Sequence, residues 1–167
     1  VSGLIRSKNP QAVLSLPKGL TVRKVYDRLI FSLGKGQSIA NFSYRAPGPG
    51  TIYLEALDRT LRFEEIEGGM DLLEGDDENT ACLDADRVQY PLIIRNFRPG
   101  DRFVPLGMKG HRKIKDLFID LKVPSETRAL TPLLTSRDNI VWVCGYRVDD
   151  RYKVTDDTKK VLKVIIQ

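Results

Sequence analysis

The chain has 167 residues, of which 41% are hydrophobic, and this composition indicates a packed core rather than wholesale disorder. Its formal net charge is +5. The sequence contains no apolar run of the ~18 residues that a membrane-spanning helix needs, and no signal-peptide pattern.

The charge distribution favours a polyanionic partner. Between Glu55 and Asp86, twelve acidic and two basic residues give a net charge of −10, so the remainder of the chain carries +15. An asymmetry of this size is typical of proteins that bind nucleic acid. The alternative is a basic surface that only keeps the protein soluble.

The chain begins with Val1 rather than Met, so we expect functional parts outside it.

Two cysteines and one histidine limit the metal chemistry of the chain. Cys82 and Cys144 form no CxxC or zinc-finger spacing, and His111 is the single histidine. We therefore predict no metal site, and two reduced thiols in a cytoplasmic protein.

The first half of the chain, residues 1–80, is predicted to be a small β-rich unit. Alternating apolar and β-branched residues between turn residues are typical of short strands. The acidic loop 64–79 is interpreted as a solvated linker, or else as a shield that covers a basic surface until RNA displaces it. The predicted strands lie within 12–16, 20–26, 29–33, 39–44, 51–57 and 60–66.

The second half, residues 81–167, is predicted to be a small α+β domain with one main helix near 112–122. The apolar residues of this helix fall on one arc ~100° wide, which indicates a face that packs on a core. Ser125 is expected to be the N-cap of a short turn through Arg128. Predicted strands are Pro91–Ile94, a central Ile140–Cys144 with Trp142 in the core, and a closing Val161–Ile166. The arc contains Ile114, Leu117, Phe118 and Leu121.

The stretch Arg95–Phe118 carries the main functional signal. It gathers seven cations and only two acids, Asp101 and Asp116, and its first part is rich in proline and glycine. A basic, glycine-containing loop that leads into a helix is a candidate phosphate site. For Arg95, at the end of an apolar strand, we expect a pair with Asp101 or Asp84. The structural loop residues are Pro99, Gly100, Asp101, Gly107 and Gly110.

The predicted helix start strengthens the phosphate hypothesis. Cations in the first turn oppose the helix dipole, and a bound anion would reverse that cost. Gly110 is the nearest N-cap candidate. Lys113 has Asp116 and Asp120 as predicted neighbours on the helix, so we expect Lys115 to contribute more to anion binding. The cations assigned to this first turn are Arg112, Lys113 and Lys115.

His111 also permits an enzymatic interpretation. A histidine can act as a general base near neutral pH, but no Ser or Cys lies close in the sequence. We therefore favour a phosphate contact or a plain surface residue, and rank a hydrolase far below the other readings.

Several motifs within residues 82–167 occur in a fixed order. Together they resemble the C-terminal domain of bacterial tRNA(Ile)-lysidine synthetases, whereas residues 1–80 are similar to the preceding segment much more weakly. The motifs are Asp84-Ala-Asp, LIIRNFRPGDRFVPLGMKG at 92–110, KIKDLFID at 113–120, Lys122-Val-Pro, Pro132-Leu-Leu, VWVCGYR at 141–147 and RYKVT at 151–155.

The resemblance implies a fold and an activity for the parent protein. Such enzymes use ATP, with Mg²⁺, to join lysine to the wobble cytidine of tRNA(Ile), first adenylating the cytidine. That chemistry belongs to an N-terminal domain with a Ser-Gly-Gly-x-Asp-Ser loop, which this chain lacks. The resemblance implies that this chain holds no catalytic residue and no cofactor. The implied fold is a β-sandwich similar to a domain of phenylalanyl-tRNA synthetase β subunits.

The implied role is to hold the acceptor-stem side of the tRNA while the enzyme's own N-terminal domain acts. A stem of A-form RNA is gripped mainly through its shape and phosphates, which suits the basic stretch. The alternative is a protein-interaction module, including a homodimer, that uses faces of opposite charge. The predicted RNA contacts are Arg98, Arg102, Lys109, Arg112, Lys113 and Lys115, followed by Arg128, Arg147 and Arg151.

Overall fold

The computed structural model describes residues 13–17, 20–25, 28–33, 41–68 and 77–167. The chain divides into two compact units, Val1–Ile39 and Ala40–Gln167. The described part of the first unit is an antiparallel sheet in the order β1-β2-β3. These strands confirm the predictions for this region. They are β1 (Val13–Ser15), β2 (Leu20–Val25) and β3 (Arg28–Leu33).

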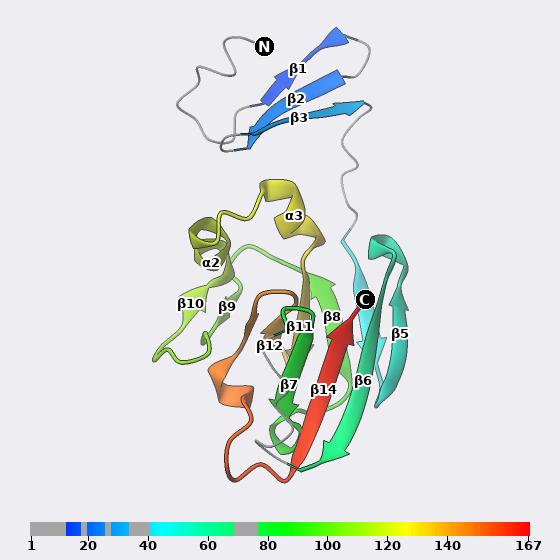
Figure 1. Ribbon diagram of the computed structural model, residues 1–167, viewed down its shortest axis with the longest axis vertical. Coiled ribbons are helices and arrows are strands. Elements are labelled where there is room, and N and C mark those ends of the chain that lie inside the picture. Colours follow the sequence, from blue (N-terminus) through cyan, green and yellow to red (C-terminus); the bar gives the residue numbers. More distant parts are fainter. Residues whose placement is uncertain (1–12, 18–19, 26–27, 34–40, 69–76) are drawn as a thin grey trace. The chain divides into compact units, whose positions relative to one another are not determined.

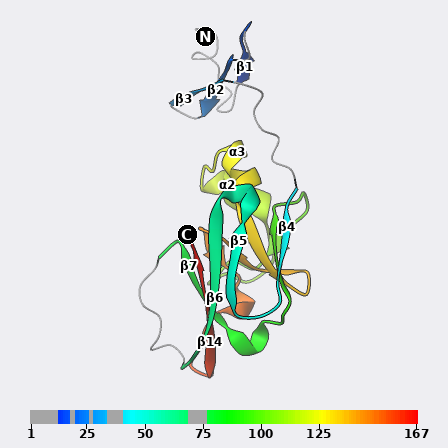
Figure 2. The same cartoon turned by 90° about the vertical axis from the view of Figure 1, so that its right-hand side faces the viewer.

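The described part of the second unit contains two larger antiparallel sheets (Figures 1 and 2). The five-stranded sheet has the order β13-β12-β11-β8-β4, with β4 (Ser43–Ala46), β8 (Leu92–Asn96), β11 (Pro132–Ser136), β12 (Asn139–Val143) and β13 (Arg147–Val148). The four-stranded sheet has the order β5-β6-β14-β7, with β5 (Gly50–Leu54), β6 (Arg59–Glu67), β7 (Thr80–Asp84) and β14 (Lys160–Ile166).

Shorter elements complete the second unit. A two-stranded ribbon is formed by β9 (Arg102–Phe103) and β10 (Arg112–Lys113). Two α-helices follow the ribbon, α2 (Ile114–Asp120) and α3 (Ser125–Leu130). Among the described residues of this unit, three short 3-10 helices lie at the ends of strands, η2 (Glu55–Leu57), η4 (Ala85–Arg87) and η5 (Asp150–Tyr152).

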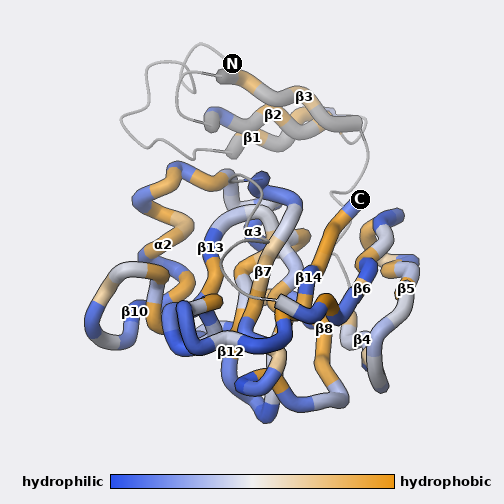
Figure 3. The backbone as a smooth tube through the Cα atoms, turned by 60° about the horizontal axis from the view of Figure 1, so that its bottom comes forward, coloured by the Kyte–Doolittle hydropathy of each residue, from blue (hydrophilic) through white to orange (hydrophobic). Residues whose placement is uncertain are grey.

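The alternation of side chains along β11 and β12 explains why this sheet is covered on both faces. Leu134 and Trp142, which are register partners, lie in the core that also contains Leu162 and Val164 of the other sheet. Leu133 and Val143 point the other way, into a second cluster that contains Ile114, Leu117 and Phe118 of α2. The unit is therefore a β-sandwich with a helical layer, which confirms the α+β prediction and the core position of Trp142. Figure 3 shows hydrophobic stretches along β8, β14 and α2.

The boundary between the units differs from the one expected near residue 80. β4 pairs with β8, and β6 pairs with β14, so residues 43–67 supply strands to both sheets of the second unit. The acidic composition changes near residue 80, but strand pairing crosses that point. The predicted acidic loop 64–79 is also wrong at its start, because residues 64–67 form the end of β6. Residues 69–76 of that loop lie outside the described residues.

The main helix is shorter than predicted. Arg112 and Lys113 form β10, and Lys113 occupies the N-cap position of α2, so Gly110 is not the cap. At the other end Leu121 is 45% exposed and leaves the predicted apolar arc, and Lys122 has a positive φ of 53° that ends the helical turn. Ser125 is the first residue of α3 rather than its N-cap, because Pro124 holds the cap position without a side-chain hydrogen bond.

Candidate nucleic-acid interface

A buried ion pair fixes the start of the basic stretch. Arg95 donates from both terminal nitrogens to the two carboxylate oxygens of Asp101, each at 2.8 Å. The side chains of Arg95 and Asp101 are only 11% and 13% exposed. Of the two partners expected for Arg95, the structure therefore selects Asp101. Because Arg95 occupies both carboxylate oxygens, Asp101 forms no ion pair with the neighbouring Arg98 or Arg102.

Asp101 also links the turn to the helix. Its Oδ2 accepts a hydrogen bond from the backbone N–H of Arg98 at 2.7 Å, and its carbonyl accepts one from Ile114 N–H at 3.0 Å. Gly100 between them has a φ of 96°, a conformation that glycine adopts at little cost. The turn, the β9–β10 ribbon and the first residue of α2 are consequently held together by one carboxylate residue.

Two exposed cations face each other on the ribbon. Arg102 of β9 and Lys113 of β10 are direct cross-strand partners. Side chains of such partners lie on the same face of the ribbon, with Cβ atoms about 4.5–5.5 Å apart. Within the described residues neither side chain has a hydrogen bond or an ion pair. Like charges placed this way disfavour the free ribbon, and an anion bound between them would remove that cost.

Three other cations predicted as RNA contacts are exposed and lie close to β9 or β10 in the sequence. Arg98, Lys109 and Lys115 are solvent-exposed, and in the described part of the chain their side chains have no ion pair. Arg112 differs, because it is half-buried and forms an ion pair with Asp120. Asp120 therefore neutralises Arg112 and not Lys113, so the expected division between Lys113 and Lys115 loses its basis.

The second group of predicted contacts is largely engaged inside the fold. Arg151 makes a bidentate pair with Asp149, with both N–H···O distances at 2.9 Å, and Asp149 is fully buried. This pair raises the pKa of Arg151. Arg128 donates from Nε to the carbonyl of Val123 at 2.8 Å, which closes the link between α2 and α3. Of this group only Arg147, on β13, is exposed.

Two adjacent aspartates support the hairpin loop, and sequence reasoning did not assign them this role. Asp149 accepts a hydrogen bond from Val104 N–H, and Asp150 accepts one from Gly107 N–H, each at 2.9 Å. The bond from Gly107, followed by the bond from Lys153, lowers the pKa of Asp150. The only signal in the sequence was an Asp-Asp pair flanked by arginines, which by itself indicates no more than a turn.

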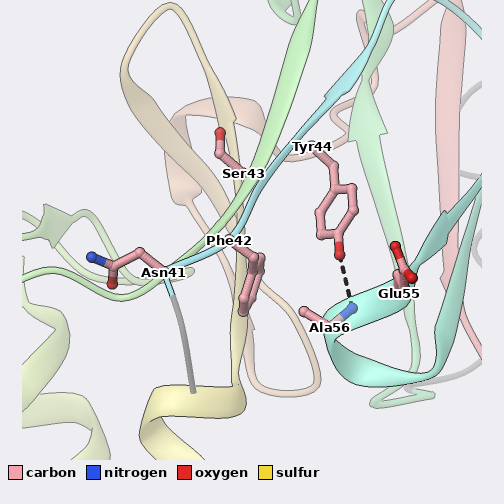
Figure 4. A pocket seen from close by; sticks show the side chains of 6 residues that line it. All are labelled: Asn41, Phe42, Ser43, Tyr44, Glu55 and Ala56. Carbon is pink, nitrogen blue, oxygen red and sulfur yellow. Dashed lines mark hydrogen bonds between the residues drawn. The ribbon is translucent and has the colours of Figure 1, made fainter. Parts of the chain in front are cut away.

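Two shallow cavities lie elsewhere on the unit. One of about 400 Å³ is lined by residues 41–44 of β4 and the segment before it, and by Glu55 and Ala56. Figure 4 shows Tyr44 there, whose hydroxyl accepts a hydrogen bond from Ala56 N–H at 2.8 Å. The other, of about 390 Å³, is lined by residues of α3, the first residue of β11 and the segment before β7, and includes Cys144 and Tyr146. Neither cavity contains any of the cations predicted to bind RNA.

The remaining candidate groups offer little chemistry. Burial raises the pKa of both the Cys82 and the Cys144 thiols, so neither is a ready nucleophile. His111 is exposed, and among the described residues its side chain has no hydrogen-bond partner. In the same part of the chain no three His, Cys, Asp or Glu side chains are grouped to hold a metal ion. No described helix has the length and apolar character needed to span a membrane.

Comparisons with known proteins converge on one family. Residues 92–165 match the family model described as the TilS substrate C-terminal domain. A tRNA(Ile)-lysidine synthase of Geobacter sulfurreducens is 32% identical over 167 residues, which cover 100% of this chain and 35% of that protein. One of Caldanaerobacter subterraneus is 31% identical over 161 residues, covering 94% of this chain and 33% of that protein. The chain thus spans about a third of the length of these relatives.

A similar fold occurs in solved structures. The crystal structure of a TilS C-terminal domain has a TM-score of 0.66 and 24% identity, and it covers 76% of this chain and 96% of that chain. This similarity supports the β-sandwich assignment. An N-terminal fragment of the phenylalanyl-tRNA synthetase β subunit from Pyrococcus horikoshii matches with a TM-score of 0.44 and 21% identity, over 52% of this chain and 27% of that chain.

Proposed function

Because residues 92–165 of this chain belong to the family of TilS substrate C-terminal domains, we propose that the chain is the tRNA-holding part of a tRNA(Ile)-lysidine synthase. The parent enzyme would attach lysine to the wobble cytidine of tRNA(Ile) with ATP, in the cytoplasm. We assign ATP, Mg²⁺ and the catalytic residues to an N-terminal domain outside this chain, since the sequence has no Ser-Gly-Gly-x-Asp-Ser loop. This chain would bind the acceptor-stem side of the same tRNA.

The observation that carries the proposal is the pair of exposed cations, Arg102 and Lys113, on the β9–β10 ribbon. Asp101 anchors the base of the ribbon through Arg95, so the two charges are held in place before any ligand arrives. A phosphate of an RNA strand supplies the missing counter-charge. Double-stranded RNA is bound largely through its backbone and shape, which requires few base-specific groups. Arg98, Lys109 and Lys115 would extend the contact along the strand, and Arg112 would have to leave Asp120 to join it.

The acidic segment gives less support to the alternative of a protein-interaction module or homodimer. Glu64 forms an ion pair with Arg62 on the same strand. Lys160 of β14 lies 3.6 Å from Glu65 and 3.7 Å from Glu67. These acids of β6 are therefore partly neutralised within their own sheet, which leaves them less available to a basic partner surface.

Binding measurements over a salt series test the proposed function. The 167-residue chain should bind a tRNA(Ile) transcript and a hairpin of its acceptor stem with similar affinity at low salt, and a hairpin of the anticodon stem more weakly. The logarithm of the binding constant should fall with the logarithm of salt concentration by roughly 0.7–0.9 per phosphate neutralised. Absence of binding to all three RNAs at low salt would contradict the proposal. Equal affinity for both stems would remove the acceptor-stem assignment. Sedimentation of the chain alone tests the homodimer.

A further inference from the structure

Two apolar side chains are exposed at the tip of the basic hairpin. Leu106 and Met108 are 45% and 49% exposed. They belong to the loop 104–111 that joins β9 to β10. The body of that hairpin carries the Arg102–Lys113 pair. One short hairpin, β9 to β10, therefore carries a mainly apolar tip and a positively charged body.

Backbone hydrogen bonds hold this tip in place. Leu106 N–H donates to the carbonyl of Val148 at 3.1 Å, and Met108 N–H donates to the carbonyl of Pro105 at 2.9 Å. Gly107 N–H, between them, donates to Asp150 Oδ1 at 2.9 Å. Pro105 itself is buried. The fold therefore holds the loop backbone in a conformation that exposes the two apolar side chains. A mobile loop, by contrast, could have folded them inward.

The charge around the tip identifies the kind of ligand. Lys109 is exposed next to Met108, and Arg102 lies four residues before Leu106, at most ~14 Å along an extended chain. A surface that combines cations with exposed apolar groups suits a ligand with both phosphates and apolar ring faces. Nucleic acid has both, and leucine and methionine are among the side chains that proteins place against bases.

We propose that Leu106 and Met108 pack against the face of an unpaired or stem-terminal base, beside the strand whose phosphates lie against Arg102 and Lys113. This proposal rests on the proposed RNA-binding function and adds a base contact to it. Every base has an apolar face, so the contact would recognise the end of a stem rather than a particular sequence. Methionine is flexible enough to fit different bases. The tip would set the position of the chain along the stem.

The test uses acceptor-stem hairpins labelled with 2-aminopurine, either at an unpaired 3′ nucleotide or at a paired position inside the stem. We compare Leu106→Ser and Met108→Ser with Ile119→Ser as a matched control, because Ile119 on α2 is 46% exposed and lies outside the hairpin. Each tip variant should weaken binding roughly threefold to tenfold, the effect of burying about half of such a side chain. The slope of affinity against salt should stay unchanged.

The fluorescence of the unpaired or terminal label should change on binding to the unaltered chain, and that change should be lost in the tip variants. The label inside the stem should report no difference between variants. If the tip variants bind like Ile119→Ser and keep the fluorescence change, the base contact is wrong while the RNA-binding function stands. If the unaltered chain binds none of these RNAs at low salt, both proposals are overturned together. Similar unfolding temperatures for all three variants exclude misfolding as the cause.

Discussion

Arg102 and Lys113 face each other across the β9–β10 ribbon as direct cross-strand partners, and neither side chain has a counter-ion among the described residues. Opposed like charges on a ribbon cost stability, by roughly 0.2–1 kcal/mol at low salt. The arrangement is understandable if the pair is kept for a ligand. It also predicts that removing either charge changes stability and RNA binding in opposite directions.

Replacing Arg102 or Lys113 by glutamine should stabilise the free protein and weaken its binding to RNA. Each change should raise the free energy of unfolding by up to ~1 kcal/mol at low salt, and lower the salt slope of tRNA binding by roughly 0.7–0.9. Urea unfolding and a salt series of binding constants measure the two effects. Lys159→Gln is the control, because Lys159 is an exposed cation in the loop before β14. A loss of both stability and binding would instead indicate a structural role.

The Arg95–Asp101 pair should be far more important for stability than the Arg112–Asp120 pair. Asp101→Asn leaves a buried guanidinium without its carboxylate, and breaking such a pair typically costs ~3–5 kcal/mol. Asp120→Asn removes the partner of Arg112, but the Asp120 side chain is 58% exposed, so the expected cost is about 0–1 kcal/mol. Chemical unfolding of the two variants gives the comparison. Equal costs would show that Asp101 does not anchor the ribbon.

Arg151 should behave as a structural residue. Arg151→Gln removes the bidentate partner of the fully buried Asp149, so we expect a loss of ~3 kcal/mol or more in unfolding free energy. The salt slope of RNA binding should stay within error of the unaltered chain at a temperature where the variant is folded. Arg147→Gln is the matched change, since Arg147 is exposed. If Arg151→Gln lowers the salt slope of RNA binding and Arg147→Gln does not, Arg151 contacts the RNA and this prediction is wrong.

The tether between Asp150 and Gly107 should survive mild acid. The hydrogen bond from Gly107, followed by that from Lys153, lowers the pKa of Asp150 below its ordinary value of 3.8. A carboxyl group with a depressed pKa in the fold contributes stability above its unfolded-state pKa and loses it as the pH falls through the folded value. The NMR chemical shift of the Gly107 amide proton reports the protonation of Asp150, so its change with pH should have a midpoint below pH 3.8. Asp150→Asn should abolish that titration, and an inflection above pH 4 would contradict the tether.

The strands with strong local patterns were predictable from the sequence. The run Ile140–Cys144 combines β-branched residues with an aromatic one, and it forms β12 with Trp142 in the core, nearly as expected. Val161–Ile166 corresponds closely to β14. Both strands lie inside their sheets, with a neighbouring strand on each side. Their apolar, β-branched composition therefore matches the buried environment in which they are found.

The ribbon was not predictable because its pairing is not local. Arg112 and Lys113 look like the first turn of a helix, but they pair with β9 as an extended strand. That extension shifts the cations relative to α2, so Asp120 meets Arg112 where helical spacing assigned it to Lys113. The same limit applies to the domain boundary. Composition changes along the chain near residue 80, but β6 finds its partner in β14, far beyond that point.

The position of β14 has a consequence for how the second unit forms. β14 lies between β6 and β7 and pairs with both, and it follows every other described strand in the sequence. The four-stranded sheet therefore cannot close until the residues from Lys160 onward have been made, and its contacts join distant parts of the chain, which slows folding. A product cut before Lys160 would present two unpaired strand edges in one molecule, a configuration prone to aggregation.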